Sequence, residues 1–139
     1  MSEHSGDPTY GTTLRLPGQV ESTIPKVREV LATEGFGVLT EIDVRATLKK
    51  KLDVDFRPYV ILGACHPPSA HQALCAEPGV GLLLPCNVVV AQQGEGQVVV
   101  SAVDPERMLG VVGRAEIEPL AREVGRKLRA ALARLGEAS

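Results

Sequence analysis

The segment that decides the fold runs from Asn87 to Val103 and reads Asn-Val-Val-Val-Ala-Gln-Gln-Gly-Glu-Gly-Gln-Val-Val-Val-Ser-Ala-Val. Two valine-rich runs of strand length flank a short loop with two glycines, which is the pattern of a β-hairpin. Because side chains alternate along a strand, Val88 and Val90 fall on one face and Val89 and Ala91 on the other. We therefore expect a hairpin with two apolar faces.

Three further strands are expected before the hairpin, at residues 12–16, 36–44 and 59–63. The last of these, Tyr-Val-Ile-Leu-Gly, is almost continuously apolar, which favours a central position in the sheet. Helical spacing of apolar residues and capping residues predict helices at residues 22–34, 45–52 and 69–76. Residues 80–93 are expected to form one long β-rich run that is interrupted at Pro85, because proline has no amide donor.

The C-terminal segment carries the clearest helical pattern of the chain. After a helical turn that is expected from Asp104 to Leu109, apolar residues recur at helical spacing over about five turns. These residues are Ile117, Leu120, Ala121, Val124, Leu128, Ala131, Leu132 and Leu135. The order of elements predicts an α/β (α+β) fold, a two-layer sandwich of a mixed β-sheet with helices mainly on one face. Residues 1–11 are expected to be a mobile leader, and residues 12–139 a single domain.

Composition limits the classes of partner. The chain of 139 residues is 44% hydrophobic and 23% charged, as in ordinary folded domains, and its net charge of -2 disfavours nucleic-acid binding. The polar, acidic N-terminus lacks the pattern of a secretory signal, and the apolar runs are too short or too interrupted to cross a membrane. Three cysteines without an export signal argue against a disulfide framework. We expect a cytoplasmic protein with no membrane segment.

Two groups of residues are candidates for chemistry. On the strand at residues 36–44, Glu41 and Asp43 share a face, and Lys49 and Asp55 follow closely in sequence. Together they predict a polar pocket with paired charges, although a solvated surface explains the same pattern. Cys65 ends a buried strand just before a helix, a position that suits either a reactive thiol or simple packing.

Metal binding has a weaker signal. Cys65, His66, His71, Cys75 and Cys86 offer soft ligands, but the paired C-x-x-C spacing of structural zinc sites is missing. No phosphate-binding loop or nucleophile elbow occurs either. The sequence therefore assigns no catalytic residue, no metal ligand set and no cofactor.

Several longer stretches resemble the family called domain of unknown function 302. They are Gly-Phe-Gly-Val-Leu-Thr-Glu-Ile-Asp at residues 35–43, Leu-Gly-Ala-Cys at residues 62–65 and Leu-Leu-Pro-Cys-Asn at residues 83–87. The resemblance runs from about Thr12 to the C-terminus. It implies a compact α/β domain, a homodimer and no established activity. His66 stands where the family pattern has asparagine.

The leading hypothesis is a dimeric module that binds a small molecule between the ends of the strands. The predicted ligand-binding residues are Glu41, Asp43, Lys49, Asp55, Gly63, Cys65, His66, Cys86 and Asn87. The alternative is a thiol-dependent redox protein, or a metal- or haem-binding protein, that uses Cys65 with His66 or Cys86. The homodimer follows independently from the second apolar face of the hairpin, which one helical layer cannot cover.

Overall fold

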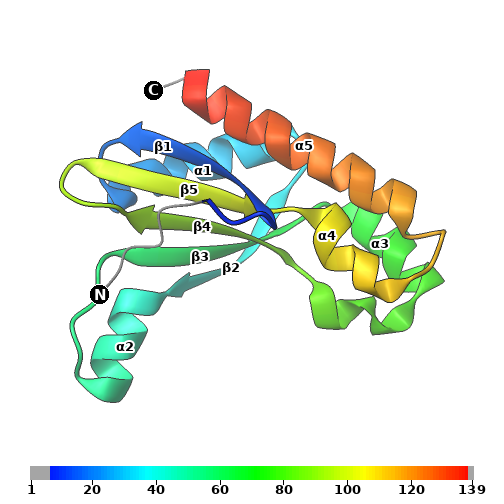
Figure 1. Ribbon diagram of the computed structural model, residues 1–139, viewed down its shortest axis with the longest axis horizontal. Coiled ribbons are helices and arrows are strands. Elements are labelled where there is room, and N and C mark those ends of the chain that lie inside the picture. Colours follow the sequence, from blue (N-terminus) through cyan, green and yellow to red (C-terminus); the bar gives the residue numbers. More distant parts are fainter. Residues whose placement is uncertain (1–6, 138–139) are drawn as a thin grey trace.

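Five strands form one sheet in the order β1-β5-β4-β3-β2 in the computed structural model, which describes residues 7–137 (Figure 1). They are β1 (Gly11–Pro17), β2 (Gly37–Asp43), β3 (Tyr59–Cys65), β4 (Cys86–Gln92) and β5 (Gln97–Val103). All neighbouring pairs of strands are antiparallel. The sequence predicts a mixed sheet, so this detail of the prediction differs from the structure. The strands β1 and β2 do run in the same direction, but they lie at opposite edges and never pair.

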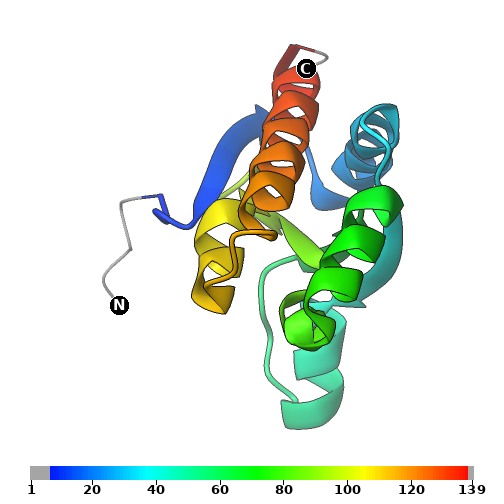
Figure 2. The ribbon, with the colours of Figure 1, turned by 90° about the vertical axis from the view of Figure 1, so that its right-hand side faces the viewer.

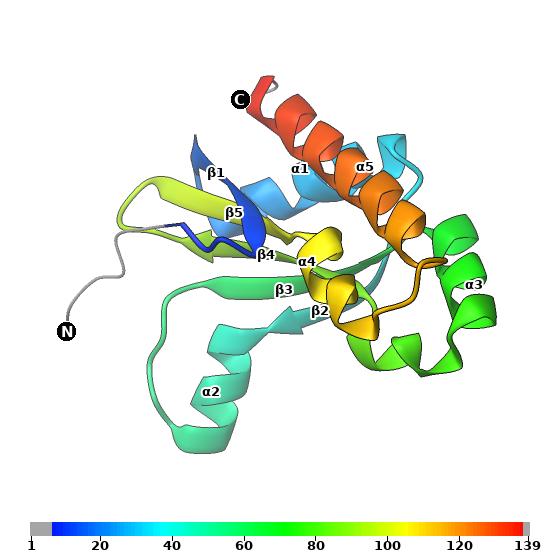
Figure 3. The same cartoon turned by 45° about the vertical axis from the view of Figure 1, so that its right-hand side comes forward.

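Two long helices cover one face of this sheet, as the sequence predicts. They are α1 (Val20–Thr33) and α5 (Glu118–Glu137), which lie side by side over the strands in Figure 2. The helices α3 (Pro67–Ala76) and α4 (Pro105–Leu109) gather at one end of the sheet with two short 3-10 turns, η1 (Pro78–Leu83) and η2 (Gly110–Val112). Figure 3 shows α2 (Val44–Leu52) well apart from α1 and α5.

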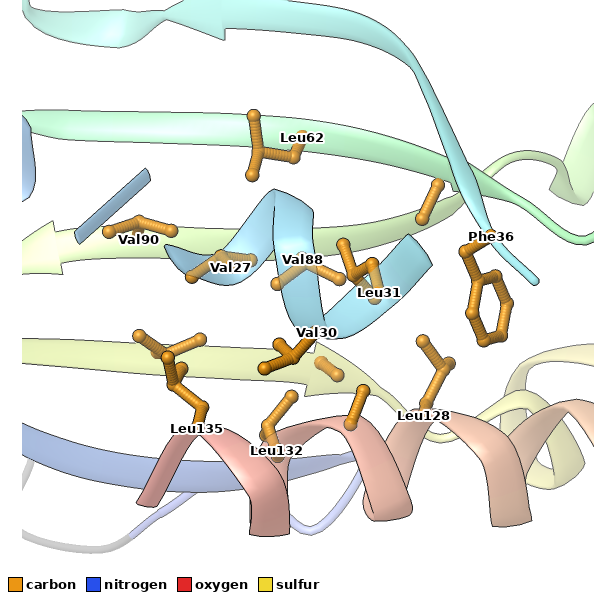
Figure 4. Close-up of a cluster of buried hydrophobic side chains, with 14 of the residues drawn as sticks. Val27, Val30, Leu31, Phe36, Leu62, Val88, Val90, Leu128, Leu132 and Leu135 are labelled. Carbon is orange, nitrogen blue, oxygen red and sulfur yellow. The ribbon is translucent and has the colours of Figure 1, made fainter. Parts of the chain in front are cut away.

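The main core lies between the sheet and the helices α1 and α5. Figure 4 shows Val27 and Leu31 of α1 facing the apolar stripe of α5 and the inner side chains of β3 and β4. Those side chains are Leu62, Val88, Val90, Leu128, Leu132 and Leu135. The core is therefore almost wholly aliphatic, and hydrophobic burial of this kind is the main force that holds the two layers together.

The other face of the sheet is only partly covered. The register places Val89 opposite Ile61 and Ser101, and Ala91 opposite Tyr59 and Val99. Ile42 of β2 pairs with Ile61 and is 47% exposed. We call the partly exposed surface formed by Ile42, Tyr59, Ile61, Val89 and Val99 the open sheet face.

One local prediction differs from the structure. Residues 78–83 form η1 rather than the start of a long β-rich run, and β4 begins only at Cys86. Residues 7–10 of the expected leader contact the domain, because the Tyr10 carbonyl accepts the Asp104 amide at 2.7 Å and Asp7 pairs with Arg15 at 2.6 Å. Residues 1–6 of that leader lie outside the described residues. Between residues 7 and 137, none of the helices has the length and apolar character that crossing a membrane requires.

Candidate functional site

A hollow of about 420 Å³ opens between α1 and the end of β2, and we call it the α1–β2 hollow. The first turn of α1, the start of α2, the start of β3 and the end of β4 also contribute to it. Its lining residues are Gln19, Val20, Glu21, Ile24, Glu41, Asp43, Arg45, Pro58, Tyr59, Val60 and Gln92. Two of the predicted site residues, Glu41 and Asp43, are therefore on its wall.

The two carboxylates reach the same hollow because of the register of β2. A β-bulge lies between Val38 and Thr40, and beyond it Glu41 pairs with Leu62 and Asp43 with Val60. The buried partners face the helical layer, so both carboxylates lie on that side of the edge strand. The shared face that the sequence predicts is thus present.

Both carboxylates already make one structural interaction. The Arg28 guanidinium of α1 donates to Glu41, which ties the helix to the sheet edge. The Asp43 carboxylate accepts the Ala46 amide at 2.9 Å and caps the N-terminus of α2. Each group keeps a second carboxylate oxygen that can accept a hydrogen bond from a ligand.

Glu21 and Arg45 complete the charged part of the lining. Both side chains are exposed, and within residues 7–137 neither forms an ion pair. The lining thus holds three carboxylates and one guanidinium, and Arg28 from outside the lining already neutralises one of the carboxylates, that of Glu41. Val20, Ile24 and Pro58 supply an apolar wall next to these charges.

Gln92 closes one end of the hollow and holds two turns together. Its Nε2 donates to the carbonyl oxygens of Gln97 at 2.9 Å, Gly94 at 3.1 Å and Gly18 at 3.4 Å. Its Oε1 is buried without a donor among the described residues. The hairpin loop is thereby fixed against the turn that leads into α1.

The other predicted site residues lie elsewhere. Lys49 pairs with Asp53 at 3.0 Å and Asp55 at 3.4 Å, all three exposed on α2 and the loop after it. Neither Lys49 nor Asp55 lines the α1–β2 hollow. Their charges are satisfied locally, and exposed pairs of this kind add little stability.

Gly63, Cys65, His66, Cys86 and Asn87 gather at the opposite end of β3. Gly63 pairs with Asn87 and Ala64 with Cys86, whereas Asp43 pairs with Val60. Val60 and Cys65 are five residues apart on one strand, a separation of roughly 16 Å. The structure therefore brings the cysteines and asparagine together but does not bring them to Asp43.

The chemistry available to this second group is limited. Burial and the neighbouring Cys65 raise the pKa of the Cys86 thiol to about 11, which keeps it protonated at neutral pH. His66 accepts or donates a hydrogen bond to Ser69 through Nδ1 at 2.8 Å, and its ring packs against Phe36. Cys75 and His71 are exposed on α3. No cluster of three or more potential His, Cys, Asp or Glu metal ligands occurs within the described part of the chain.

Sequence reasoning did not find Glu21, Arg45 or Gln92. They come from three segments that are far apart in the sequence and meet only after the sheet has formed. The single local signal was the position of Glu21 in the first turn of α1, where acidic residues are common for helix stability alone.

Comparisons with known proteins point to one family. The family model described as "Domain of unknown function DUF302" matches residues 12–135. Among solved structures, the chain is similar to the "uncharacterized conserved protein DUF302 from Bacillus stearothermophilus". The two share 31% sequence identity with a TM-score of 0.84, over 92% of this chain and 99% of the other. No curated protein matches the sequence significantly.

Proposed function

The chain belongs to the DUF302 family, and from its own geometry we propose that it is a small-molecule-binding module whose ligand occupies the α1–β2 hollow. The observation that carries the proposal is the hollow itself, in which charged and apolar walls meet. Its volume of about 420 Å³ lies within the range of small-molecule sites. Such sites combine an apolar lining with a few polar groups that orient the ligand.

The charges of the lining restrict the ligand. Glu21 and Asp43 accept hydrogen bonds and repel anions, Glu41 is already neutralised by Arg28, and Arg45 is the positive donor of the lining. Ile24 and Pro58, which are partly exposed, offer an apolar surface beside them. We expect a small neutral or cationic molecule that carries hydroxyl or ammonium donors and a short apolar portion.

Thermal denaturation with a panel of probes tests this proposal. Spermidine represents amines, glucose represents polyols and succinate represents dicarboxylates. We expect an amine or a polyol to raise the melting temperature, because a ligand that binds only the folded state stabilises it, and succinate to have no effect. The absence of a shift with every amine and polyol would reject the proposal.

Variants then locate the site. Glu21→Gln and Arg45→Gln remove charges that form no ion pair within residues 7–137, so both proteins are expected to fold normally. Glu21→Gln should weaken binding of the amine, and Lys50→Gln, an exposed change on α2 outside the lining, should not. A ligand effect that is equal in all three variants would place the ligand elsewhere.

We further propose that two copies pair through the open sheet face. Five strands about 4.8 Å apart and seven residues long at about 3.3 Å each span roughly 550 Å², or about 1,100 Å² for two copies. That area reaches the size of a specific interface. The face is largely apolar, and the Arg15 guanidinium on it is neutralised by Asp7. Sedimentation of the unmodified chain at micromolar concentration tests the pairing.

The thiol alternative has less support. In a redox or nucleophilic role for Cys65 with Cys86 at least one of the two thiols has to ionise, and burial raises the pKa of Cys86 to about 11, so Cys86 does not supply that thiolate at neutral pH. A cytoplasmic location stays a prediction from the sequence.

A further inference from the structure

The helix α2 and the loop after it, residues 44–56, form a projection that we call the α2 arm. Figure 1 shows the arm extending away from the strands. In Figures 1, 2 and 3 the strands lie between the arm and the long helices α1 and α5. The arm therefore stands on the side of the molecule to which the open sheet face is turned.

The α2 arm carries apolar side chains that neither buried cluster takes up. Val44, Leu48 and Leu52 follow one another at intervals of four residues, so they form one stripe of the helix. Leu52 is 65% exposed, and Val54 in the loop is 43% exposed. Within residues 7–137, no residue of the arm belongs to either hydrophobic cluster. Leu52 and Val54 thus leave aliphatic surface in contact with water in the single chain.

The α2 arm is anchored to the sheet at both of its ends. At its start, the Asp43 carboxylate accepts the Ala46 amide at 2.9 Å. At its end, the Phe56 ring lies 6.1 Å from the Tyr59 ring of β3, and the Arg57 guanidinium lies 4.9 Å from the centre of the Phe56 ring. These contacts define where the arm stands relative to the open sheet face.

The length of α2 brings the arm to a second copy when two open sheet faces meet. Sheets that pack face to face lie about 10 Å apart, whereas a helix of nine residues is about 13.5 Å long. An arm that leaves the sheet on its open side is therefore long enough to reach the second copy.

The area that a stable dimer needs favours the same contact. The two open sheet faces alone supply about 1,100 Å², which is near the lower limit for a specific interface. Treated as a rod about 13.5 Å long and about 10 Å wide, each arm covers about 135 Å² of its own surface and as much of the second copy. With both arms the interface reaches roughly 1,600 Å², the usual size for stable complexes.

We propose that, in the pair joined through the open sheet faces, the α2 arm of each copy packs Leu52 and Val54 against the other copy. This inference rests on the pairing proposed above and adds the arm to its interface. A two-fold interface uses each contact twice, so both arms are covered. A membrane with anionic lipids is disfavoured as the occupant, because the exposed carboxylates of Asp53 and Asp55 alternate with the two aliphatic side chains.

Sedimentation equilibrium of the full chain tests the inference. A double variant, Leu52→Gln with Val54→Gln, replaces aliphatic surface by polar amides and leaves both anchors of the arm intact. It should raise the dissociation constant of the dimer at least about tenfold, because two aliphatic side chains in each copy lose their burial. Val111→Gln makes the same kind of change at an exposed residue of η2 and should leave the constant unchanged.

Hydrogen exchange of the unmodified chain gives a second readout that needs no variant. The α2 amides should exchange at least about threefold more slowly well above the dissociation constant of the dimer than well below it, because the arm is covered only in the dimer. Equal exchange at the two concentrations, or an unchanged dissociation constant in the double variant, would overturn the inference.

The outcomes separate the role of the arm from the pairing itself. A dimer that Val89→Lys on the open sheet face disrupts, but the double variant does not, would leave the pairing in place and reject the arm. A monomeric unmodified chain would reject both. Binding of the unmodified chain to phosphatidylserine vesicles, lost in the double variant while the dimer persists, would assign the arm to a lipid surface and reject its role in the dimer.

Discussion

Among single residues, Gly63 has the least room for a side chain. It lies on β3 between β2 and β4, and a Cβ atom there would come within 2.2 Å of the Thr40 hydroxyl and 2.7 Å of the Pro85 ring. The hydroxyl can rotate away, but the proline ring is part of the backbone and cannot. Only glycine therefore lets β2 and the start of β4 approach β3 this closely.

Gly63→Ala is expected to lower the free energy of unfolding by about 3 kcal/mol, at the upper end of the usual cost of overpacking. Urea denaturation measures the change. Gly37→Ala is the matched control, because Gly37 also lies in the sheet but a Cβ atom there meets nothing within 4 Å. Equal midpoints for the two variants would contradict the steric explanation.

His66 gives the fold a defined dependence on pH. Burial lowers its pKa below the ordinary value of 6.5, Lys127 lowers it further, and Glu123 offsets part of that effect. The folded state thus binds a proton at His66 less readily than the unfolded state does. The stability linked to this group is complete above pH 6.5 and is lost as the pH falls from 6.5 toward the pKa of the folded state.

Urea denaturation at about pH 7.5 and about pH 5 measures this dependence. The unmodified chain should lose more stability between the two pH values than His66→Gln does. His71→Gln, a change of an exposed histidine on α3, should behave as the unmodified chain. Parallel losses in the unmodified chain and His66→Gln would show that other groups cause the pH dependence.

Of the α-helices within residues 7–137, α2 is the one held least by the core. None of its residues is buried, and its first turn depends on the cap from Asp43 to the Ala46 amide. It ends at Asp53, which has a left-handed conformation with φ of 53°. A helix of nine residues without a buried face is marginal by itself, so local contacts decide whether it forms.

Asp43→Ala should therefore destabilise α2 by about 1 kcal/mol without unfolding the sheet. Hydrogen exchange at the α2 amides should become about fivefold faster, while exchange at β3 and β4 stays the same. Asp55→Ala removes a nearby exposed carboxylate that caps no helix and should leave the exchange of α2 unchanged. Uniform acceleration across the whole chain would contradict a local role for Asp43.

The elements also show which parts of the fold the sequence could predict. The hairpin was predictable because the alternation of valines and the glycine loop are local signals, and the pairing of Val90 with Val100 confirms it. The conformation of residues 78–83 was not predictable, because a short apolar run fits either a strand or a helical turn. Val80 packs in the small cluster with Ala73 and Leu109, and these distant contacts favour the 3-10 turn.

For the whole molecule, strand order was the missing information. The pairing of β1 with β5 joins residues almost ninety positions apart, such as Thr13 and Ser101, and no local pattern encodes it. The missing strand order also limited the prediction of the site. Alternation placed Glu41 and Asp43 on one face, but only the pairing of β2 with β3 shows that Cys65 lies at the other end of β3, five residues from the partner of Asp43.

The open sheet face carries the prediction about assembly. Val89 and Val99 lie on it in adjacent strands, and both are partly exposed although they are aliphatic. A two-fold interface brings each of these side chains against a second copy of the same apolar surface. Val89→Lys or Val99→Lys would bury an unpaired ammonium group in each copy, at a cost of several kcal/mol.

Sedimentation velocity at micromolar concentration should therefore show dimers for the unmodified chain and monomers for Val89→Lys and Val99→Lys. In the separated chains a lysine on this face reaches water through its flexible stem, so circular dichroism should show that both variants remain folded. Leu82→Lys makes the same chemical change at an apolar residue of η1 that is 92% exposed and lies outside the open sheet face. It should leave the dimer intact, because it charges no part of the interface. A monomeric unmodified chain, or dimers that persist in both valine variants, would show that this face does not pair.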